Sequence, residues 1–290
     1  MKQLILTTCL YLFSLCVYSQ DSTSLSKMQA GIQLNTIPYL SVNNSDTFYS
    51  NSLVVAPFIR YYYQGFGVKY APYFITGGSK PGIYMQTVTA GYEQYNKEHI
   101  NLDLSYTHFF FSGNSTIPYT PLNNELYGFI SLKKPWLAPL LSVDLGFGKD
   151  ESGQEQAGLN AAAGLSHSFT SNGTHLFSSI EIDPSLLVNG SANDFYSFLT
   201  SSKYITHNKN YGNYIKTNGR ARRQTGGGST GSQSTTKAGS PFVFSNMELN
   251  VYSDLTAHHF EIIPVASLYF PLEKTLPVSG YWELKLAYDF

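Results

Sequence analysis

The sequence predicts an all-β protein, a transmembrane antiparallel up-and-down β-barrel of about twelve strands. Apolar and polar residues alternate with a period of two in segments of about ten residues, as a strand between lipid and a polar lumen requires. Short and long connections between these segments alternate along the chain. After the first twenty positions no apolar run reaches the roughly 20 residues of a membrane helix. Any membrane span must therefore be built from strands.

The composition agrees with this fold class. Aromatic residues make up 15% of the chain, with 23 Tyr and 19 Phe, and charged residues only 13%. Aromatic side chains favour strands and membrane interfaces. The formal net charge of -1 gives no electrostatic reason for a nucleic-acid partner, and we expect none.

The first element, residues 1–20, is expected to be a cleaved signal peptide. Lys2 provides a positive start, a short apolar stretch follows, and cleavage is expected after Ser19 or Gln20. Both cysteines of the chain fall within this segment. The mature chain, residues 21–290, is thus predicted to lack disulfides and thiolate metal sites.

Twelve alternating segments follow and are interpreted as the barrel strands. The clearest begins at Ile100, where apolar residues at even positions oppose polar residues at odd positions as far as Thr107. The expected strands are 28–38, 52–63, 66–76, 83–94, 99–110, 125–134, 137–148, 157–169, 175–187, 240–254, 259–270 and 280–290. Four outward prolines lie inside strands and each removes a ladder donor, which predicts bulges at some of them: Pro57, Pro72, Pro139 and Pro264.

Connections of different length are expected at opposite ends of the barrel. An even strand count returns both termini to the end with the short turns, which in outer-membrane barrels is periplasmic. The longest connection, at about 188–239, is expected to be external. Its first part is basic, and its second part is so poor in apolar residues that we expect flexibility there. The basic residues are Lys203, Lys209, Lys216, Arg220, Arg222 and Arg223. They are candidates for binding lipopolysaccharide phosphates, and a solvated flap without a partner is the alternative.

The polar face of the strands predicts an acidic lumen. Its carboxylates are Glu93, Asp103, Glu125, Asp144, Glu181, Asp183, Glu248, Asp254, Glu261, Glu283 and Asp289, and its bases are Arg60, Lys69, Lys133 and Lys285. A pore lined in this way favours cations or neutral polar solutes over anions. The alternative is that these charges pair with one another and fill the barrel, because twelve strands are compatible with either outcome.

The C-terminal segment from Trp282 to Phe290 resembles the last strand of outer-membrane β-barrel proteins, which ends on an aromatic residue preceded by apolar residues at every second position. The matching residues are Leu284, Leu286, Tyr288 and Phe290. The resemblance implies recognition by the barrel-assembly machinery, location in the bacterial outer membrane and contact with outer-membrane lipids and lipopolysaccharide. The segment from Val55 to Tyr63 also resembles strands of small, mostly uncharacterised barrel families, which implies no substrate.

The leading functional hypothesis is a non-enzymatic barrel, either a narrow channel for small polar or cationic solutes or a structural or surface-binding protein, without cofactor or metal. The alternative is a lipid-modifying enzyme of the phospholipase or lipid A deacylase type. Ser171-Asn172-Gly173 resembles part of the outer-membrane phospholipase motif, but Phe169 stands where that family has its catalytic His. His108, with Ser112 beyond it, is the other candidate pair. His258 and His259 are interpreted as solvated turn residues.

Overall fold

The computed structural model describes most of the predicted barrel. The described residues are 26–36, 40–42, 46–48, 53–76, 82–94, 99–112, 123–133, 135–149, 153, 155–172, 176–192, 242–272 and 278–290. All regular elements among them are β-strands, and none of these residues forms a helix long and apolar enough to cross a membrane. The expected signal peptide and the basic residues of the longest connection lie outside the described residues.

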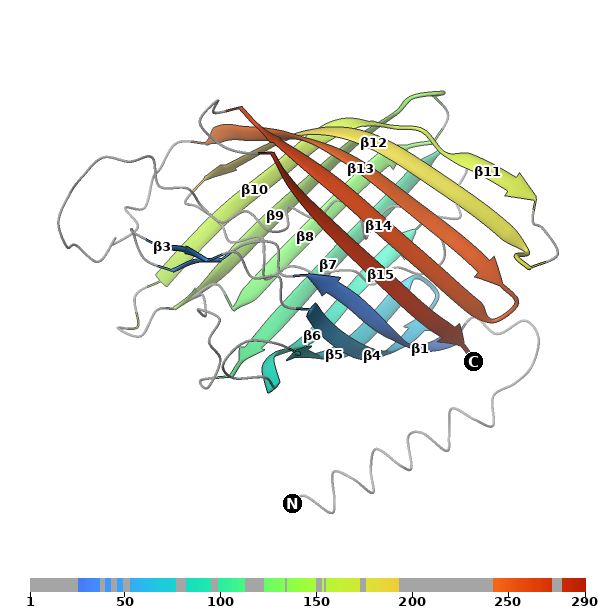
Figure 1. Cartoon of the computed structure of the whole chain (residues 1–290), viewed down its shortest axis with the longest axis horizontal. Helices are drawn as coiled ribbons and strands as arrows, with labels where there is room; N and C mark the ends of the chain where they lie inside the picture. The colour runs from blue at the N-terminus through green and yellow to red at the C-terminus, as the bar shows by residue number, and fades with distance from the viewer. Residues whose placement is uncertain are drawn as a thin grey trace, which may run out of the picture.

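Twelve strands form one closed antiparallel barrel (Figure 1). Successive strands pair with each other, β1 also pairs with β15, and β10 pairs with β12, so each barrel strand has a partner on both sides. The predicted fold class, an all-β antiparallel barrel of twelve strands, is confirmed. The strands are β1 (Ser26–Thr36), β4 (Leu53–Tyr63), β5 (Phe66–Ile75), β6 (Gly82–Gln94), β7 (Ile100–Phe111), β8 (Asn124–Leu132), β9 (Ala138–Lys149), β10 (Glu155–Ser166), β12 (Ser179–Ala192), β13 (Val243–Ala257), β14 (Phe260–Pro271) and β15 (Ser279–Asp289).

Three short strands complete the described structure. β11 (Phe169–Asn172) continues the line of β10 along β12 after a break at His167 and Ser168. β2 (Leu40–Val42) and β3 (Asp46–Phe48) form a separate two-stranded sheet within the connection from β1 to β4.

The two ends of the barrel differ in their connections. At the end called here the short-turn end, two-residue turns join β4 to β5 at Gln64 and Gly65 and β13 to β14 at His258 and His259. The first residue of β1 also lies there, because Ser26 pairs with the last residue of β4, and Figure 1 shows the C-terminus at the same end. The opposite end is called the long-loop end.

Strand β12 differs most from the prediction, since residues 188–192 of the expected external loop belong to it. The sequence appeared loop-like there because Asn189 is polar. In the barrel this side chain is fully buried and donates hydrogen bonds to Asn246 Oδ1 and Glu248 Oε2. Asn189 is therefore a strand residue whose side chain points into the barrel.

The prolines interrupt the hydrogen-bond ladder, and one of the four, Pro72, lies beside a register shift. Pro57 lies opposite Pro72, and the pairing of β4 with β5 lapses there between Val55 and Ile59. One register shift lies between Tyr73 and Phe74, next to Pro72, and a second lies between Asn189 and Gly190, away from any of the four prolines. The pairings of Pro139 and Pro264 with Leu165 and Leu284 stay in register.

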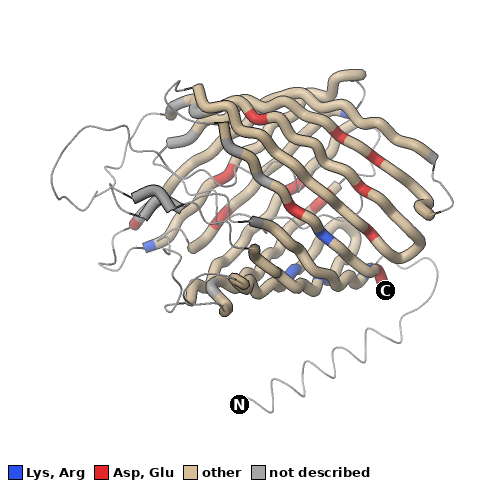
Figure 2. The backbone as a smooth tube through the Cα atoms, in the orientation of Figure 1, with Lys and Arg blue, Asp and Glu red and all other residues tan. Residues whose placement is uncertain are grey.

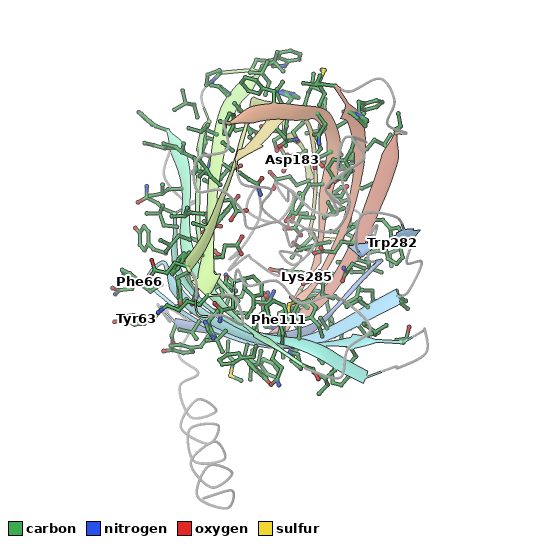
Figure 3. All side chains as sticks on the ribbon, turned by 90° about the vertical axis from the view of Figure 1, so that its left-hand side faces the viewer. Tyr63, Phe66, Phe111, Asp183, Trp282 and Lys285 are labelled. Carbon is green, nitrogen blue, oxygen red and sulfur yellow. The ribbon has the colours of Figure 1, made fainter. Side chains whose placement is uncertain are left out.

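The outward face of the barrel is apolar and exposed. Figure 3 shows Tyr63, Phe66 and Trp282 pointing away from the lumen. Exposed aliphatic side chains form a belt that includes Ile32, Val68, Val88, Leu104, Ile130, Leu141, Val143, Leu186, Leu249 and Leu286. Exposed aromatic residues flank the belt, with Tyr61, Tyr63, Phe66 and Phe260 near the short-turn end and Phe110, Phe244 and Phe270 near the long-loop end. A belt between two aromatic rows is the surface that a lipid bilayer requires.

Candidate functional site

The candidate site is the inner wall of the barrel, where alternation places the charged side chains. Twelve of the predicted lumen charges are at most 4% exposed: Arg60, Lys69, Glu93, Asp103, Glu125, Asp144, Asp183, Glu248, Asp254, Glu261, Glu283 and Lys285. Glu181 is half-buried. Figure 3 shows Asp183 and Lys285 pointing into the barrel from opposite walls. The inner wall thus carries the charged side chains together with two clusters of buried apolar and aromatic residues, while the outer wall is apolar.

The basic residues of the wall gather on four neighbouring strands, β15, β1, β4 and β5. These strands are adjacent in the barrel order, and they carry Lys285, Lys27, Arg60 and Lys69 respectively. We call this set the basic arc. No described residue of β1, β4 or β5 is acidic. Figure 2 shows the same separation of charge along the strands.

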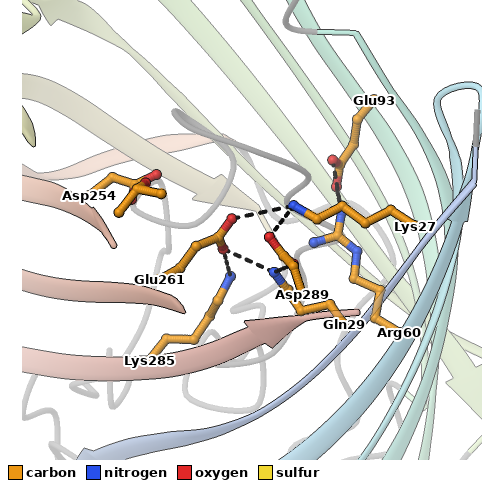
Figure 4. A network of polar contacts seen from close by, with 9 residues as sticks. Lys27, Gln29, Arg60, Glu93, Asp254, Glu261, Lys285 and Asp289 are labelled. Carbon is orange, nitrogen blue, oxygen red and sulfur yellow. Dashed lines mark hydrogen bonds and ion pairs between the residues drawn. The ribbon is translucent and has the colours of Figure 1, made fainter. Parts of the chain in front are cut away.

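Ion pairs tie the basic arc to carboxylates at its borders (Figure 4). Arg60 Nη2 lies 3.1 Å from Glu93 Oε2 on β6. Lys27 pairs with Asp289 on β15, and its Nζ lies 3.6 Å from Glu261 Oε1 on β14. Lys285 Nζ approaches the other oxygen of Glu261 to 4.0 Å. Nearby carboxylates therefore compensate the charges of Arg60, Lys27 and Lys285.

Gln29 joins the same network as a neutral donor. Its amide nitrogen lies 2.9 Å from both Glu261 Oε2 and Asp289 Oδ1. Because Gln29 is on β1, Glu261 on β14 and Asp289 on β15, these bonds cross the seam where the first barrel strand meets the last. Side-chain contacts thus reinforce the closure of the barrel.

A phenylalanine ring lies within the basic arc. The Nζ atoms of Lys69 and Lys285 lie 4.9 and 5.8 Å from the centre of the Phe58 ring, within the range of cation–π contacts. The ring packs against Gly31 of β1, where an added Cβ would lie 2.6 Å from Phe58 Cζ. Because Gly31 has no side chain, the Phe58 ring can pack closely against β1.

The charged side chains on the rest of the wall are acidic. Seven carboxylates on β7, β8, β9, β12 and β13 form what we call the acidic arc: Asp103, Glu125, Asp144, Glu181, Asp183, Glu248 and Asp254. Among the described residues of β6 to β14 the only basic one is Lys149, which is exposed at the end of β9. Several of these carboxylates accept hydrogen bonds from neutral groups, for example Glu181 from Ser168 Oγ at 2.7 Å and Glu248 from Asn189 Nδ2 at 2.9 Å.

Two differences from the predicted lumen concern lysines. Lys133 was expected inside, but it follows the last residue of β8 and is exposed. Lys27 was not predicted, because the first strand was expected to begin at residue 28. The alternation extends back to it, since Lys27, Gln29, Gln33 and Asn35 share one face of β1. That polar row was the signal that could have identified Lys27.

The residues of the predicted assembly signal lie on the outward face of β15. Leu286 and Phe290 are exposed, and the Tyr288 ring contacts those of Phe260 and Phe290 at 4.9 Å. The backbone N–H of Phe290 donates to Met28 O at 2.9 Å, which extends the pairing of β15 with β1. Leu284 lies on the same face and pairs with Leu34.

The residues considered for lipid chemistry do not form a catalytic set among the described residues. His167 Nδ1 lies 2.5 Å from the backbone oxygen of Trp136, and Ser171 is exposed on β11 near the short-turn end. His108 contacts Asn124 and Phe110, and no hydroxyl within the described ranges is hydrogen-bonded to it. No group of three metal-ligating side chains occurs in the part of the chain that is described.

Comparison with known proteins gives structural likeness alone. No protein-family model matches the chain, and no curated protein matches it. The fold is similar to an outer membrane channel from Pseudomonas putida, with 10% sequence identity and a TM-score of 0.44 over 91% of this chain and 95% of that one. It is also similar to a bacterial polysaccharide outer membrane secretin, with 10% identity and a TM-score of 0.37 over 93% of this chain and all of that one (100%). Function must therefore be argued from the residues of this chain.

Proposed function

We propose that the protein is a non-enzymatic outer-membrane channel, narrow and selective for small cationic or neutral polar solutes. The observation that carries this proposal is the acidic arc, which extends over five strands of the inner wall without an inward lysine or arginine on them among the described residues. Charges that line a pore set the sign of the ions that pass. The apolar belt and its aromatic rows support a position in the bilayer.

The distribution of charge strengthens the case for cations. Because ion pairs with Glu93, Glu261 and Asp289 compensate most of the basic arc, its positive charge is largely balanced at short range. On the described residues of β7, β8, β9, β12 and β13, no lysine or arginine points inward beside the acidic arc. The β7 to β13 side of the lumen therefore attracts cations along its length. Anions find no continuous row of uncompensated positive charge.

Conductance of the purified protein in a planar bilayer tests this function. In a potassium chloride gradient, the reversal potential should show that potassium passes more readily than chloride. The double variant Asp103→Asn and Asp144→Asn should reduce that preference, because both side chains are buried in the acidic arc. Ser142→Ala is the matched control, since it changes the same face of β9 without changing charge.

Two outcomes would contradict the proposal. Chloride preference would show that the acidic arc does not set the selectivity. A complete lack of conductance in a folded barrel would favour the structural or surface-binding function instead. Neither outcome would affect the assignment of the fold.

The partner proposals rest on the sequence. We propose that the barrel-assembly machinery reads the apolar row of β15 that ends at Phe290. We also propose that the basic residues between Lys203 and Arg223 bind lipopolysaccharide phosphates, because arginine and lysine form charge-assisted hydrogen bonds with such groups. Binding of the native chain and of a chain lacking residues 220–237 to lipopolysaccharide micelles would test the second proposal.

A further inference from the structure

Three polar side chains meet on the lipid-facing side of β7 and β8, near the long-loop end. Asn124 Oδ1 accepts a hydrogen bond from Tyr106 Oη at 2.6 Å and lies 2.8 Å from His108 Nδ1. Asn124 Nδ2 donates to Asn123 Oδ1 at 2.7 Å and to Phe147 O at 3.2 Å. Because the amide nitrogen serves two acceptors, the amide oxygen is the atom that faces His108.

This arrangement determines which nitrogen of His108 carries a proton. An amide oxygen can only accept, so Nδ1 must be the donor. The neutral ring then presents a lone pair at Nε2, and no described residue forms a hydrogen bond with that atom. The Phe110 ring packs edge-on against the imidazole with 4.5 Å between centres. In this tautomer His108 offers a hydrogen-bond acceptor at Nε2 on a surface that faces lipid.

A groove of about 470 Å³ lies beside this polar cluster on the outward face of β6 to β9. These four strands are neighbours in the barrel wall (Figure 1). The groove exists because Gly128 and Ala90 have little or no side chain between larger neighbours. Its lining also includes Leu104, Tyr106, Leu126, Val143 and Leu145.

The pairing of β7 with β8 makes the groove and the cluster continuous. Successive outward pairs are Leu104 with Gly128, Tyr106 with Leu126, and His108 with Asn124. Each outward pair is roughly 7 Å further along the strand than the last. The apolar groove therefore reaches Tyr106, and His108 lies one outward pair further along, near the aromatic row that includes Phe110.

We propose that the groove and the cluster bind one membrane phospholipid with a primary ammonium head group. Its acyl chain lies over Gly128, and its ammonium donates a hydrogen bond to His108 Nε2. The occupant is a lipid because this surface belongs to the apolar belt, where acyl chains are the surrounding solvent. The head group needs a hydrogen-bond donor because the free position on His108 is an acceptor, and a primary ammonium supplies one. This inference does not depend on the proposed channel function.

Native mass spectrometry of the full chain tests the proposal. The protein is purified from bilayers of equal parts phosphatidylethanolamine and phosphatidylcholine with identical acyl chains, and the retained lipid is counted. Only the ethanolamine head group has N–H donors. We expect one retained phosphatidylethanolamine per barrel, favoured roughly fivefold over phosphatidylcholine, as one hydrogen bond would give.

Variants separate the head group from the chain. His108→Phe should abolish the preference between the two lipids while the groove still retains either. Gly128→Leu should reduce retention of both, and Gly128→Ala, whose Cβ would lie 3.4 Å from Leu104 Cδ2, serves if the larger residue prevents folding. His258→Asn, in a turn at the other end, is the control. Equal retention of the two lipids by the native chain, or a preference that survives His108→Phe, would overturn the proposal.

Discussion

At the scale of the residue, the turn between β4 and β5 depends on glycine at position 65. Its φ is 92°, in the left-handed region, and an added Cβ would lie 2.6 Å from the Tyr92 ring and 2.9 Å from Glu93 O. Backbone conformation and space both exclude a side chain. We predict that Gly65→Ala lowers the free energy of unfolding by about 1–3 kcal/mol.

The midpoint of urea unfolding in detergent micelles measures this effect. The matched control is Gln64→Gly in the same turn. Gln64 has a φ of 49°, so glycine should be neutral or stabilising at that position. An unchanged midpoint for Gly65→Ala would mean that the turn relaxes at little cost.

At the scale of the element, the last strand, β15, carries the predicted assembly signal and also closes the barrel by pairing with β1. Phe290 contributes a ring contact to Tyr288 and a backbone hydrogen bond to Met28 of β1. We predict that deleting Phe290, or replacing it with Asp, strongly reduces the amount of folded barrel in the outer membrane. Phe290→Tyr should keep both contacts and assemble normally. The fast-migrating band of unheated samples measures the folded barrel, and equal amounts from the deletion and the native chain would contradict the assembly role.

The seam between β1 and β15 is a second prediction at this scale. Lys27 pairs with Asp289 and Glu261 across it, and one quarter of the Lys27 side chain is exposed (25%). Partial solvation weakens such pairs, so Lys27→Met should cost about 1–2 kcal/mol rather than the larger value of a fully buried pair. The temperature at which the fast-migrating band disappears should fall. Adding Asp289→Asn to Lys27→Met should recover part of the loss, and no recovery would show that the pair does not stabilise the seam.

The strands could be predicted from the sequence because one face of each meets lipid and the other does not. Ile100 to Thr107 shows this most clearly, and its odd positions are buried as expected. The break of β10 at His167 and the later start of β12 could not be predicted, because they depend on which residues pair across the wall. The arcs of the lumen also depend on strand neighbours. Lys27 and Glu261 are far apart in sequence, and only barrel closure brings them together.

At the scale of the whole molecule, barrel closure groups the charged residues of the lumen into two arcs, one basic and one acidic. β15 is the last strand of the sequence, and β1, β4 and β5 are the first three strands of the barrel. They are neighbours because the barrel joins its last strand to its first. Their bases therefore form one arc although they come from both ends of the chain. The acidic arc is what remains on the middle strands. This arrangement follows from the circular strand order and from nothing local in the sequence.

The orientation of the barrel in the membrane is the last prediction. We expect the long-loop end to lie outside the cell, so that the connection between β12 and β13 is external and both termini are periplasmic. Trypsin added to intact cells should then cut near Arg220, Arg222 and Arg223. The barrel should survive the cut, because β12 pairs with β10 and β13 pairs with β14 independently of their connection. The unheated sample should keep its fast migration and separate into two fragments on boiling. Cleavage only after the cells are opened would place the long-loop end in the periplasm and invert the proposed topology.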